Sequence, residues 1–285
     1  LISFWSQPIS FSYLVIEVFV LIVSMLFRNS YVHIHHPNPL YTVPAIWLKS
    51  CVIHWHASLS DRSWLHRKLE DLIVRISKYR RHVFIATSEF YRNQLIGSGI
   101  VKVMKVSNIF DDTRFHLEEQ VMLPDCDSYI VFSYGRHVAY KGFDLLLKAV
   151  EKITTDKPVL CVLGGVGELT NELKELAGSN ALFTGHLSDG QIAFMHRRAD
   201  LFLFPSRTEQ EAFGITLIEA MYTRNPIVRF KIPNSGVSSV CPPHVCFEVD
   251  DISSSALALS IEKALLNPDS AKLKADEAYE LFLKE

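Results

Sequence analysis

Two glutamates eight residues apart flank a Phe-Gly pair in the second half of the chain. Glu211 and Glu219 lie on either side of Phe213 and Gly214, and the apolar run from Ile215 predicts a helix start. Backbone N–H groups that lack partners at a helix start can bind an anion. The carboxylates can accept hydrogen bonds from hydroxyl groups. This set of groups matches a polyol phosphate. An equal alternative is that Glu211 only complements the helix dipole and Glu219 is solvated.

Two cations follow another apolar run that ends at Ser133. Arg136 and Lys141 lie between this run and the next amphipathic stretch, a position that suits a diphosphate. The ordinary alternative is a pair of surface cations. A third apolar run leads into Gly165 and Gly167, which resembles a nucleotide-binding turn but is a weak signal by itself.

Short apolar runs alternate with amphipathic stretches along most of the chain, which predicts an α/β fold with parallel sheets. Ligands of such sheets bind at the carboxyl ends of the strands. The expected strands cover residues 31–34, 50–54, 83–87, 101–106, 129–133, 159–163, 181–184, 201–204 and 226–230. Expected helices cover residues 61–79, 142–153, 168–177, 189–198, 215–222 and 253–266.

A polar, acidic stretch over residues 111–128 interrupts this pattern and predicts a linker. It would separate an N-terminal α/β domain, residues 1–110, from a C-terminal one, residues 129–285. We expect two Rossmann-like domains that face each other across a cleft, which is a favoured place for a ligand.

Composition excludes several classes of protein. The 285 residues carry a net charge of −2 and are 48% hydrophobic, which excludes a disordered chain and argues against a basic nucleic-acid-binding protein. Five cysteines without a C-x-x-C motif argue against a disulfide framework or a zinc knuckle. We expect reduced, mostly buried thiols in a cytosolic protein.

An apolar segment at residues 9–27 has nearly the length of a bilayer span. Glu17 near its centre makes insertion costly, so we prefer a buried helix. The chain opens inside apolar sequence without Met, which suggests a fragment.

Several motifs together resemble glycosyltransferase family 4, whose members are retaining enzymes with two facing Rossmann-like domains, the GT-B fold. The motifs are GRHVAYKGFDLLLKA, GGVGELTNEL, FTGHLSD, ADLFLFPSRTEQEAFGITLIEAM and NPIVRFKIPNSGV, and they fall within about 129–268. In the first half, YVHIHHPNPL and VIHWHASLSD resemble the bacterial mannosyltransferase-like branch that builds surface polysaccharides, among them lipopolysaccharide. Against the family pattern, we expect this chain to lack the first strands and helices of the N-terminal domain.

The resemblance implies roles for the matching residues of the second half. Arg136 and Lys141 would neutralise the donor diphosphate, Glu219 would bind the nucleotide ribose, and Glu211 would hold hydroxyls of the donor sugar. Phe213, Gly214 and Ile215 would contribute backbone N–H groups to the sugar and phosphate. Gly165 and Gly167 would line the nucleotide pocket.

Histidines dominate the matching strands of the first half. The resemblance implies that His56 lies over the reacting sugar and that His35 lines the acceptor side, without a metal. The alternative is a zinc site, because the H-x-H pairs His33 with His35, and His54 with His56, each share one face of a strand. Asp61 would complete such a site. We prefer the interpretation without metal.

Basic residues gather in the predicted helix at residues 61–82, opposite an apolar stripe. A solvated surface helix is the preferred interpretation. The alternative is a peripheral contact with anionic lipid at the inner face of the plasma membrane.

The sequence therefore predicts a retaining hexosyltransferase that uses a nucleotide-diphosphate sugar, GDP-mannose before UDP-hexose, and a glycan or lipid-linked acceptor. It would need no cofactor and no metal, and it would bind no nucleic acid. One alternative is a truncated, inactive homologue that acts as a nucleotide-sugar-binding or regulatory module. Another is an epimerase or a phosphorylase on the same fold, although no Lys site for pyridoxal phosphate is evident.

Overall fold

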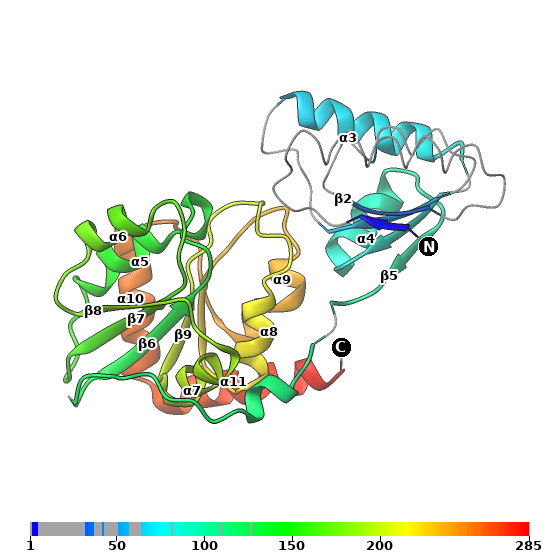
Figure 1. Ribbon diagram of the computed structural model, residues 1–285. Helices are drawn as coiled ribbons and strands as arrows, with labels where there is room; N and C mark the ends of the chain where they lie inside the picture. Colours follow the sequence, from blue (N-terminus) through cyan, green and yellow to red (C-terminus); the bar gives the residue numbers. More distant parts are fainter. Residues whose placement is uncertain are drawn as a thin grey trace. The chain divides into compact units, whose positions relative to one another are not determined.

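The computed structural model describes residues 2–4, 32–36, 42, 51–56, 64–80, 82–108, 110–125 and 127–284. The chain divides into two compact units (Figure 1). Unit 1 comprises Leu1–Asn108 with Asn234–Ser239, and unit 2 comprises Ile109–Pro233 with Val240–Glu285. The apolar segment at residues 9–27 and the proposed zinc ligand Asp61 lie outside the described residues.

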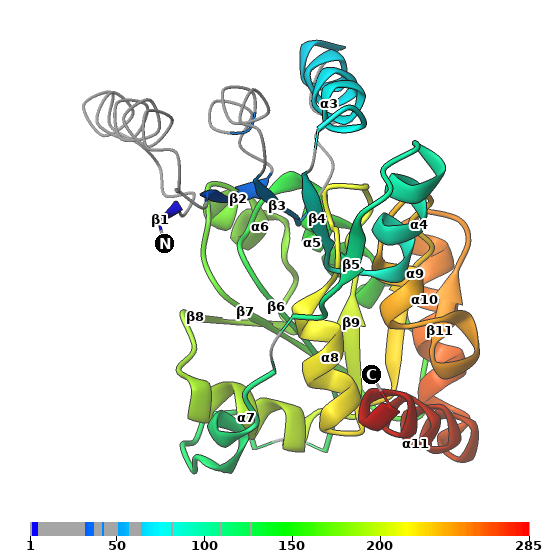
Figure 2. The same cartoon turned by 90° about the vertical axis from the view of Figure 1, so that its right-hand side faces the viewer.

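Unit 1 contains a parallel sheet in the order β1-β2-β3-β4-β5. Its strands are β1 (Ile2–Phe4), β2 (Val32–His36), β3 (Val52–Trp55), β4 (Val83–Ala86) and β5 (Val103–Lys105). Helix α3 (Trp64–Ser77) lies on one face and α4 (Glu89–Gly97) on the other (Figures 1 and 2). Alternate side chains of β2 and β3 are buried, since Ile34, His36, Ile53 and Trp55 point into the core.

Unit 2 contains a parallel sheet in the order β11-β10-β9-β6-β7-β8. Its strands are β6 (Tyr129–Tyr134), β7 (Val159–Gly164), β8 (Ala181–Gly185), β9 (Leu201–Phe204), β10 (Ile227–Phe230) and β11 (Phe247–Val249). The central strands β6, β7, β9 and β10 are almost wholly buried, which explains why they read as continuous apolar runs rather than alternating ones.

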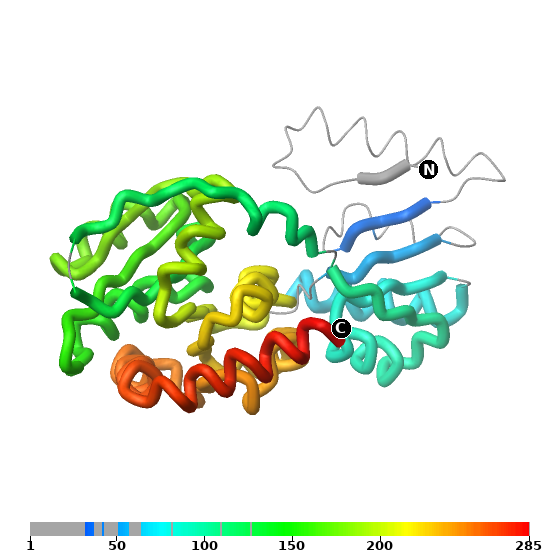
Figure 3. Tube along the Cα trace, turned by 90° about the horizontal axis from the view of Figure 1, so that it is seen from below, coloured from blue at the N-terminus to red at the C-terminus, as the bar shows by residue number. Residues whose placement is uncertain are grey.

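Helices cover both faces of this sheet. On one face α5 (Phe143–Val150), α6 (Thr170–Leu176) and α10 (Ser254–Leu265) pack together, and on the other lie α7 (Asp189–Arg198), α8 (Ile215–Tyr222) and α11 (Pro268–Lys284) (Figures 1 and 2). Figure 3 shows the whole length of α11 up to the C-terminus. The short elements of unit 2 are η1 (Thr113–His116), η2 (Ala139–Lys141) and η3 (Pro243–Val245). The short helix α9 (Val237–Val240) lies where the chain passes from unit 1 back to unit 2.

Local capping explains why several helices begin where they do. Ser188 and Gln191 form a capping box at the start of α7, in which each side chain bonds the backbone of the other residue. Ser253 caps α10 and Ser88 caps α4 by accepting a bond from the N–H three residues later. The predicted bounds of α7 and α8 are confirmed.

The predicted α/β fold with parallel sheets is confirmed. The segment at residues 111–128, which we predicted to be a linker, belongs to unit 2 and contains η1. It is anchored because Arg197 donates to the carbonyl of Phe115 at 3.2 Å and the ring of Phe115 contacts His196. Four of the five cysteines are described, and all four are free and buried, as predicted: Cys51, Cys161, Cys241 and Cys246.

Candidate functional site

The candidate residues of unit 2 gather where the strand order reverses. The chain runs outward from β6 through β7 to β8, then returns to β9 on the other side of β6 and continues through β10 to β11. The loops after β6 and β9 therefore leave the sheet toward opposite faces, and ligands of such sheets usually bind at this point of the carboxyl edge. Arg136 and Lys141 follow β6, and Glu211 and Gly214 follow β9.

Lys141 and Glu211 form an ion pair across this switch point. The same Glu211 carboxylate oxygen accepts a hydrogen bond from the Ser206 hydroxyl at 2.9 Å. Both partners are largely buried, with side-chain exposures of 15% and 11%. Burial strengthens such a pair, so the ammonium and the carboxylate are held at fixed positions before any ligand arrives. Arg136 lies in the same loop as Lys141 and is exposed.

The start of α8 provides backbone donors beside this pair. Gly214 is the N-cap with φ of 78°, and an added Cβ would lie 2.8 Å from Leu217 Cδ1, so glycine fits here best. Within the described part of the chain, the N–H groups of Phe213, Gly214 and Ile215 donate no hydrogen bond. Ile215 is 55% exposed, which leaves this helix start open to a ligand.

Glu219 lies one turn further along α8 and is almost completely buried. Its Oε1 accepts a hydrogen bond from Arg114 Nη2 at 2.7 Å, whereas its Oε2 is buried without a partner. Burial raises the pKa of Glu219 to about 7, although Arg114 opposes this by favouring the charged form. An acceptor oxygen without a donor is expected where a ligand hydroxyl would bind.

The turn after β6, which contains Gly135, packs directly on the turn after β7, which contains Gly165 and Gly167. An added Cβ at Gly165 would overlap the carbonyl oxygen of Gly135, and one at Gly167 would overlap the carbonyl of His137. The turns are joined by hydrogen bonds from Gly135 N to Gly164 O and from His137 N to Val166 O, both 3.1 Å. Gly165 and Gly167 therefore allow the loops after β6 and β7 to pack, whether or not they also line a nucleotide.

His35 and His56 lie in unit 1, at the carboxyl ends of β2 and β3. A 2.8 Å hydrogen bond joins His35 Nδ1 and His56 Nε2. Burial lowers the pKa of His56 to about 4, with neighbouring histidines adding to the effect. His35 also has a lowered pKa, chiefly through burial. Both rings are therefore neutral at pH 7.

Two residues of the site escaped the sequence prediction. Arg114, which holds Glu219, lies in the stretch expected to be a linker, where no hydrophobic periodicity marks a position. Ser206, which holds Glu211, lies five residues before it in a segment already recognised as informative. The structure thus joins Lys141 to Glu211 and Glu219 to Arg114, and it joins His35 to His56 in the other unit.

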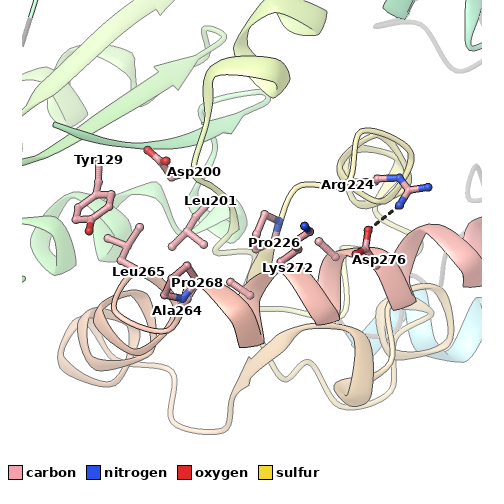
Figure 4. Close-up of a pocket in the computed structure, with 12 residues that line it drawn as sticks. Tyr129, Asp200, Leu201, Arg224, Pro226, Ala264, Leu265, Pro268, Lys272 and Asp276 are labelled. Atoms are coloured by element: carbon pink, nitrogen blue, oxygen red, sulfur yellow. Dashed lines mark hydrogen bonds and ion pairs between the residues drawn. The ribbon is translucent and has the colours of Figure 1, made fainter. Parts of the chain in front are cut away.

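A pocket of about 320 Å³ lies at the opposite edge of the unit 2 sheet (Figure 4). Its lining includes Tyr129 and Leu201, at which β6 and β9 begin, Pro226 just before β10, and residues of one side of α11. Figure 4 shows the ion pair of Arg224 with Asp276 at its rim, with an N–O distance of 2.6 Å. Since the candidate residues lie at the carboxyl ends of the strands, this pocket is separate from them.

Within the described residues, no helix has the length and apolar character that crossing a bilayer requires.

Curated relatives match different lengths of the chain. The O-antigen chain mannosyltransferase C of Escherichia coli is 34% identical over 108 residues, which is 37% of this chain and 28% of that protein. The mannosylfructose-phosphate synthase of Agrobacterium fabrum is 33% identical over 221 residues, which is 69% of this chain and 47% of that protein. The chain therefore spans less than half the length of either relative.

Solved structures share the fold at low identity. A sucrose-phosphate synthase from Thermosynechococcus elongatus superposes with a TM-score of 0.75 at 18% identity, covering 99% of this chain and 76% of that one. Anabaena HepE in complex with UDP superposes with a TM-score of 0.71 at 18% identity, covering 94% and 77%. The family model described as "Glycosyl transferases group 1" matches residues 117–280, which include Arg136, Lys141, Glu211 and Glu219 but not Arg114, and the chain belongs to that family.

Proposed function

We propose that the protein transfers a hexose, mannose before others, from a nucleotide-diphosphate sugar to a hydroxyl of a glycan or lipid-linked acceptor. The observation that carries this proposal is the group of residues at the switch point of unit 2. Exposed Arg136, paired Lys141, the open start of α8 and two buried carboxylates lie on the loops and the helix at one edge of one sheet. This combination suits a ligand with both phosphates and hydroxyls.

Each group has a place in the proposed donor complex. Arg136, Lys141 and the N–H groups at the start of α8 would stabilise the negative charge that develops on the leaving diphosphate. Glu211 would exchange its bond with Lys141 for donor-sugar hydroxyls, and the unpartnered Oε2 of Glu219 would accept a ribose hydroxyl. His56 and His35 would contribute from the acceptor side.

Retention of configuration would follow from attack on the face of the departing diphosphate. The bond between the anomeric carbon and the phosphate oxygen breaks as the acceptor oxygen bonds to that carbon. The acceptor proton passes to the leaving phosphate oxygen. The chain supplies charge stabilisation and positioning, and in this scheme it needs no metal or other cofactor.

The donor preference rests on the names of relatives. The Escherichia coli relative is named a mannosyltransferase and the Agrobacterium relative a mannosylfructose-phosphate synthase, which supports mannose. HepE was solved with UDP and with UDP-glucose, so a uridine nucleotide is the second choice. We place GDP-mannose first.

Calorimetric titration tests the donor site. GDP, UDP, GDP-mannose and UDP-glucose are titrated into the wild type and into Arg136→Ala, Glu219→Ala and the exposed α5 control Lys148→Ala. The proposal expects binding of a guanine nucleotide that Lys148→Ala retains and the two site variants lose. Failure of every nucleotide to bind would contradict both the transferase and the binding-module alternative.

Turnover then separates the remaining functions. Release of GDP from GDP-mannose with a mannoside or lipid-linked acceptor, and an α-anomer in the product by NMR, would support retaining transfer. Donor binding without product for any acceptor would favour the nucleotide-sugar-binding or regulatory module.

Helix α3 bears on the proposed location, the cytoplasm with peripheral contact at the inner membrane face. Trp64, Leu65 and Tyr79 at and just beyond its ends are 69%, 50% and 86% exposed, beside cations such as Lys68 and Arg75. Exposed aromatic and basic groups together suit an anionic lipid surface. Flotation with phosphatidylglycerol vesicles, but not with phosphatidylcholine vesicles, is expected, and Trp64→Ser should weaken it. Equal behaviour with both lipids would contradict this contact.

A further inference from the structure

Four histidines line one face of the unit 1 sheet. Strands β2 and β3 are parallel neighbours in a register that pairs His35 with His54. Because side chains alternate along a strand, His33 and His35 share a face with His54 and, just beyond the end of β3, with His56. The opposite face carries the buried core residues, and His36 on that face bonds Glu70 instead.

The imidazole rings are close enough to share a ligand. Ring centroids of His33 and His35 are 4.8 Å apart, those of His35 and His54 are 5.1 Å apart, and those of His54 and His56 are 4.0 Å apart. One ligand nitrogen from each of His33, His35 and His54 lies within 4.8 Å of the others. Nitrogens around a tetrahedral zinc ion are about 3.3 Å apart for Zn–N bonds of ~2.0–2.1 Å, so modest side-chain rotations would close the site.

Two of these nitrogens lack a hydrogen-bond partner within the described part of the chain. Nε2 of His33 and Nε2 of His54 are both buried, and neither is hydrogen-bonded to a described residue. A buried ring nitrogen without a partner is unfavourable, and two on adjacent strands call for a common explanation. A positively charged acceptor of lone pairs would satisfy both.

We infer that His33, His35 and His54 bind a zinc ion, with His56 orienting His35 through the 2.8 Å hydrogen bond between their rings. Imidazole nitrogens are ordinary zinc ligands, and hydrogen bonds from outside the ligand set commonly fix their orientation. Three protein ligands leave one tetrahedral position for water or a small ligand. His35 and His56 are also the residues proposed for the acceptor side, but zinc binding in unit 1 can be measured without nucleotide and without the candidate residues of unit 2.

Metal titration of the purified full chain tests this inference. The metal-free protein is titrated with Zn²⁺ in competition with a chromogenic chelator, for the wild type, His33→Gln, His54→Gln and the control His244→Gln. His244 is exposed and belongs to unit 2, so it is not a member of the unit 1 cluster. One zinc ion per chain is expected, with affinity lowered on the order of 100-fold in each cluster variant and unchanged in the control.

Cobalt substitution gives a readout that does not depend on the folding of a variant. Co²⁺ bound by imidazoles in the wild type should give the visible bands of a tetrahedral site without the charge-transfer band of a thiolate ligand. A thiolate band would assign the metal to cysteines and overturn the inference. So would a wild type that binds no stoichiometric zinc, or variants that retain the wild-type affinity.

Discussion

At the residue scale, two opposing influences act on the protonation of the Glu219 carboxyl group. Burial favours its neutral form, whereas the Arg114 guanidinium and a ribose hydroxyl that donates a hydrogen bond both favour the carboxylate. With the pKa raised to about 7, a large fraction of Glu219 is protonated in the free protein at neutral pH. Arg114 supplies one charge-assisted bond, and the ligand would supply the partner that Oε2 lacks.

The affinity for nucleotide should therefore depend on pH. If the carboxylate form of Glu219 binds the ribose, affinity should rise about tenfold per pH unit below pH 7 and level off above it. Calorimetry with GDP between pH 5.5 and 8.5 measures this profile. Glu219→Gln should bind more weakly with a flat profile, and a flat profile for the wild type would contradict the ribose role.

Stability should change with pH in the opposite direction. The folded-state pKa of Glu219 lies above its unfolded value of 4.5, so the folded state holds the extra proton between pH 4.5 and about 7. Stability from this group is therefore present below pH 4.5 and is lost as pH rises through 7, by about 3 kcal/mol in total. Thermal unfolding should show Glu219→Gln more stable than the wild type at pH 8 and not at pH 5. An equal difference at both values would show that protonation is not the cause.

At the scale of the elements, the turns after β6 and β7 hold each other in place. Gly165 has φ of 103°, and its missing side chain leaves room for the carbonyl of Gly135. The loop that carries Arg136 and Lys141 is therefore positioned by a neighbouring turn as well as by its own strand. A side chain at this position would move the cations as well as strain the backbone.

Gly165→Ala should lower the free energy of unfolding by more than about 2 kcal/mol, because strain at positive φ adds to the overlap. Gly185→Ala is the matched control, since Gly185 also has a positive φ of 71° but an added Cβ there would have no atom within 4 Å. The control should lose only about 1 kcal/mol. Denaturant unfolding measures both, and equal losses would show that the packing of the two turns contributes nothing.

A buried arginine joins the last two strands of unit 2. Arg229 on β10 is fully buried, donates from Nε to the carbonyl of Cys241 at 2.9 Å and forms an ion pair with Glu248 of β11. The ion-pair atoms are 2.7 Å apart but are not aligned as a hydrogen bond, so the pair acts mainly through charge.

Arg229→Met should destabilise the protein by about 3–5 kcal/mol, because Glu248 is left buried without its counter-charge. The double variant Arg229→Met with Glu248→Met should regain most of that loss, since no uncompensated charge remains. Denaturant unfolding of the two variants compares them. A double variant no more stable than the single one would show that the hydrogen bond to Cys241 matters more than the charge pair.

At the scale of the whole molecule, the chemistry divides between two units. The groups proposed to bind phosphate, ribose and sugar hydroxyls all belong to unit 2, whereas the four histidines belong to unit 1. Nucleotide binding and zinc binding should accordingly be separable by measurement.

Hydrogen exchange with mass spectrometry should show this division. GDP is expected to slow exchange in residues 135–142 and 206–216 of unit 2 while α3 and α4 keep their rates. Zinc is expected to slow exchange in β2 and β3 instead. Protection by GDP that is confined to unit 1 would contradict the assignment of the donor site.

The sequence by itself predicted the fold class, the positions of most strands and helices, and the candidate donor-site residues of unit 2. Buried parallel strands need apolar runs and helices need amphipathic ones, so both kinds of element leave a local pattern in the sequence. The helices Phe143–Val150, Asp189–Arg198 and Ile215–Tyr222 are examples. The spacing of Glu211 and Glu219 around Gly214 is likewise a local pattern, fixed by one turn and one helix.

Only the tertiary structure decided which groups meet. Arg114 and Glu219 are 105 residues apart in the sequence, and Lys141 and Glu211 are 70 residues apart. No local sequence pattern predicts that these residues pair. The register of β2 against β3 likewise converts two H-x-H pairs into one cluster with two unpartnered nitrogens. Strand order and register depend on long-range packing, which is why the ion pairs of the site and the proposed zinc ligands emerge from the fold.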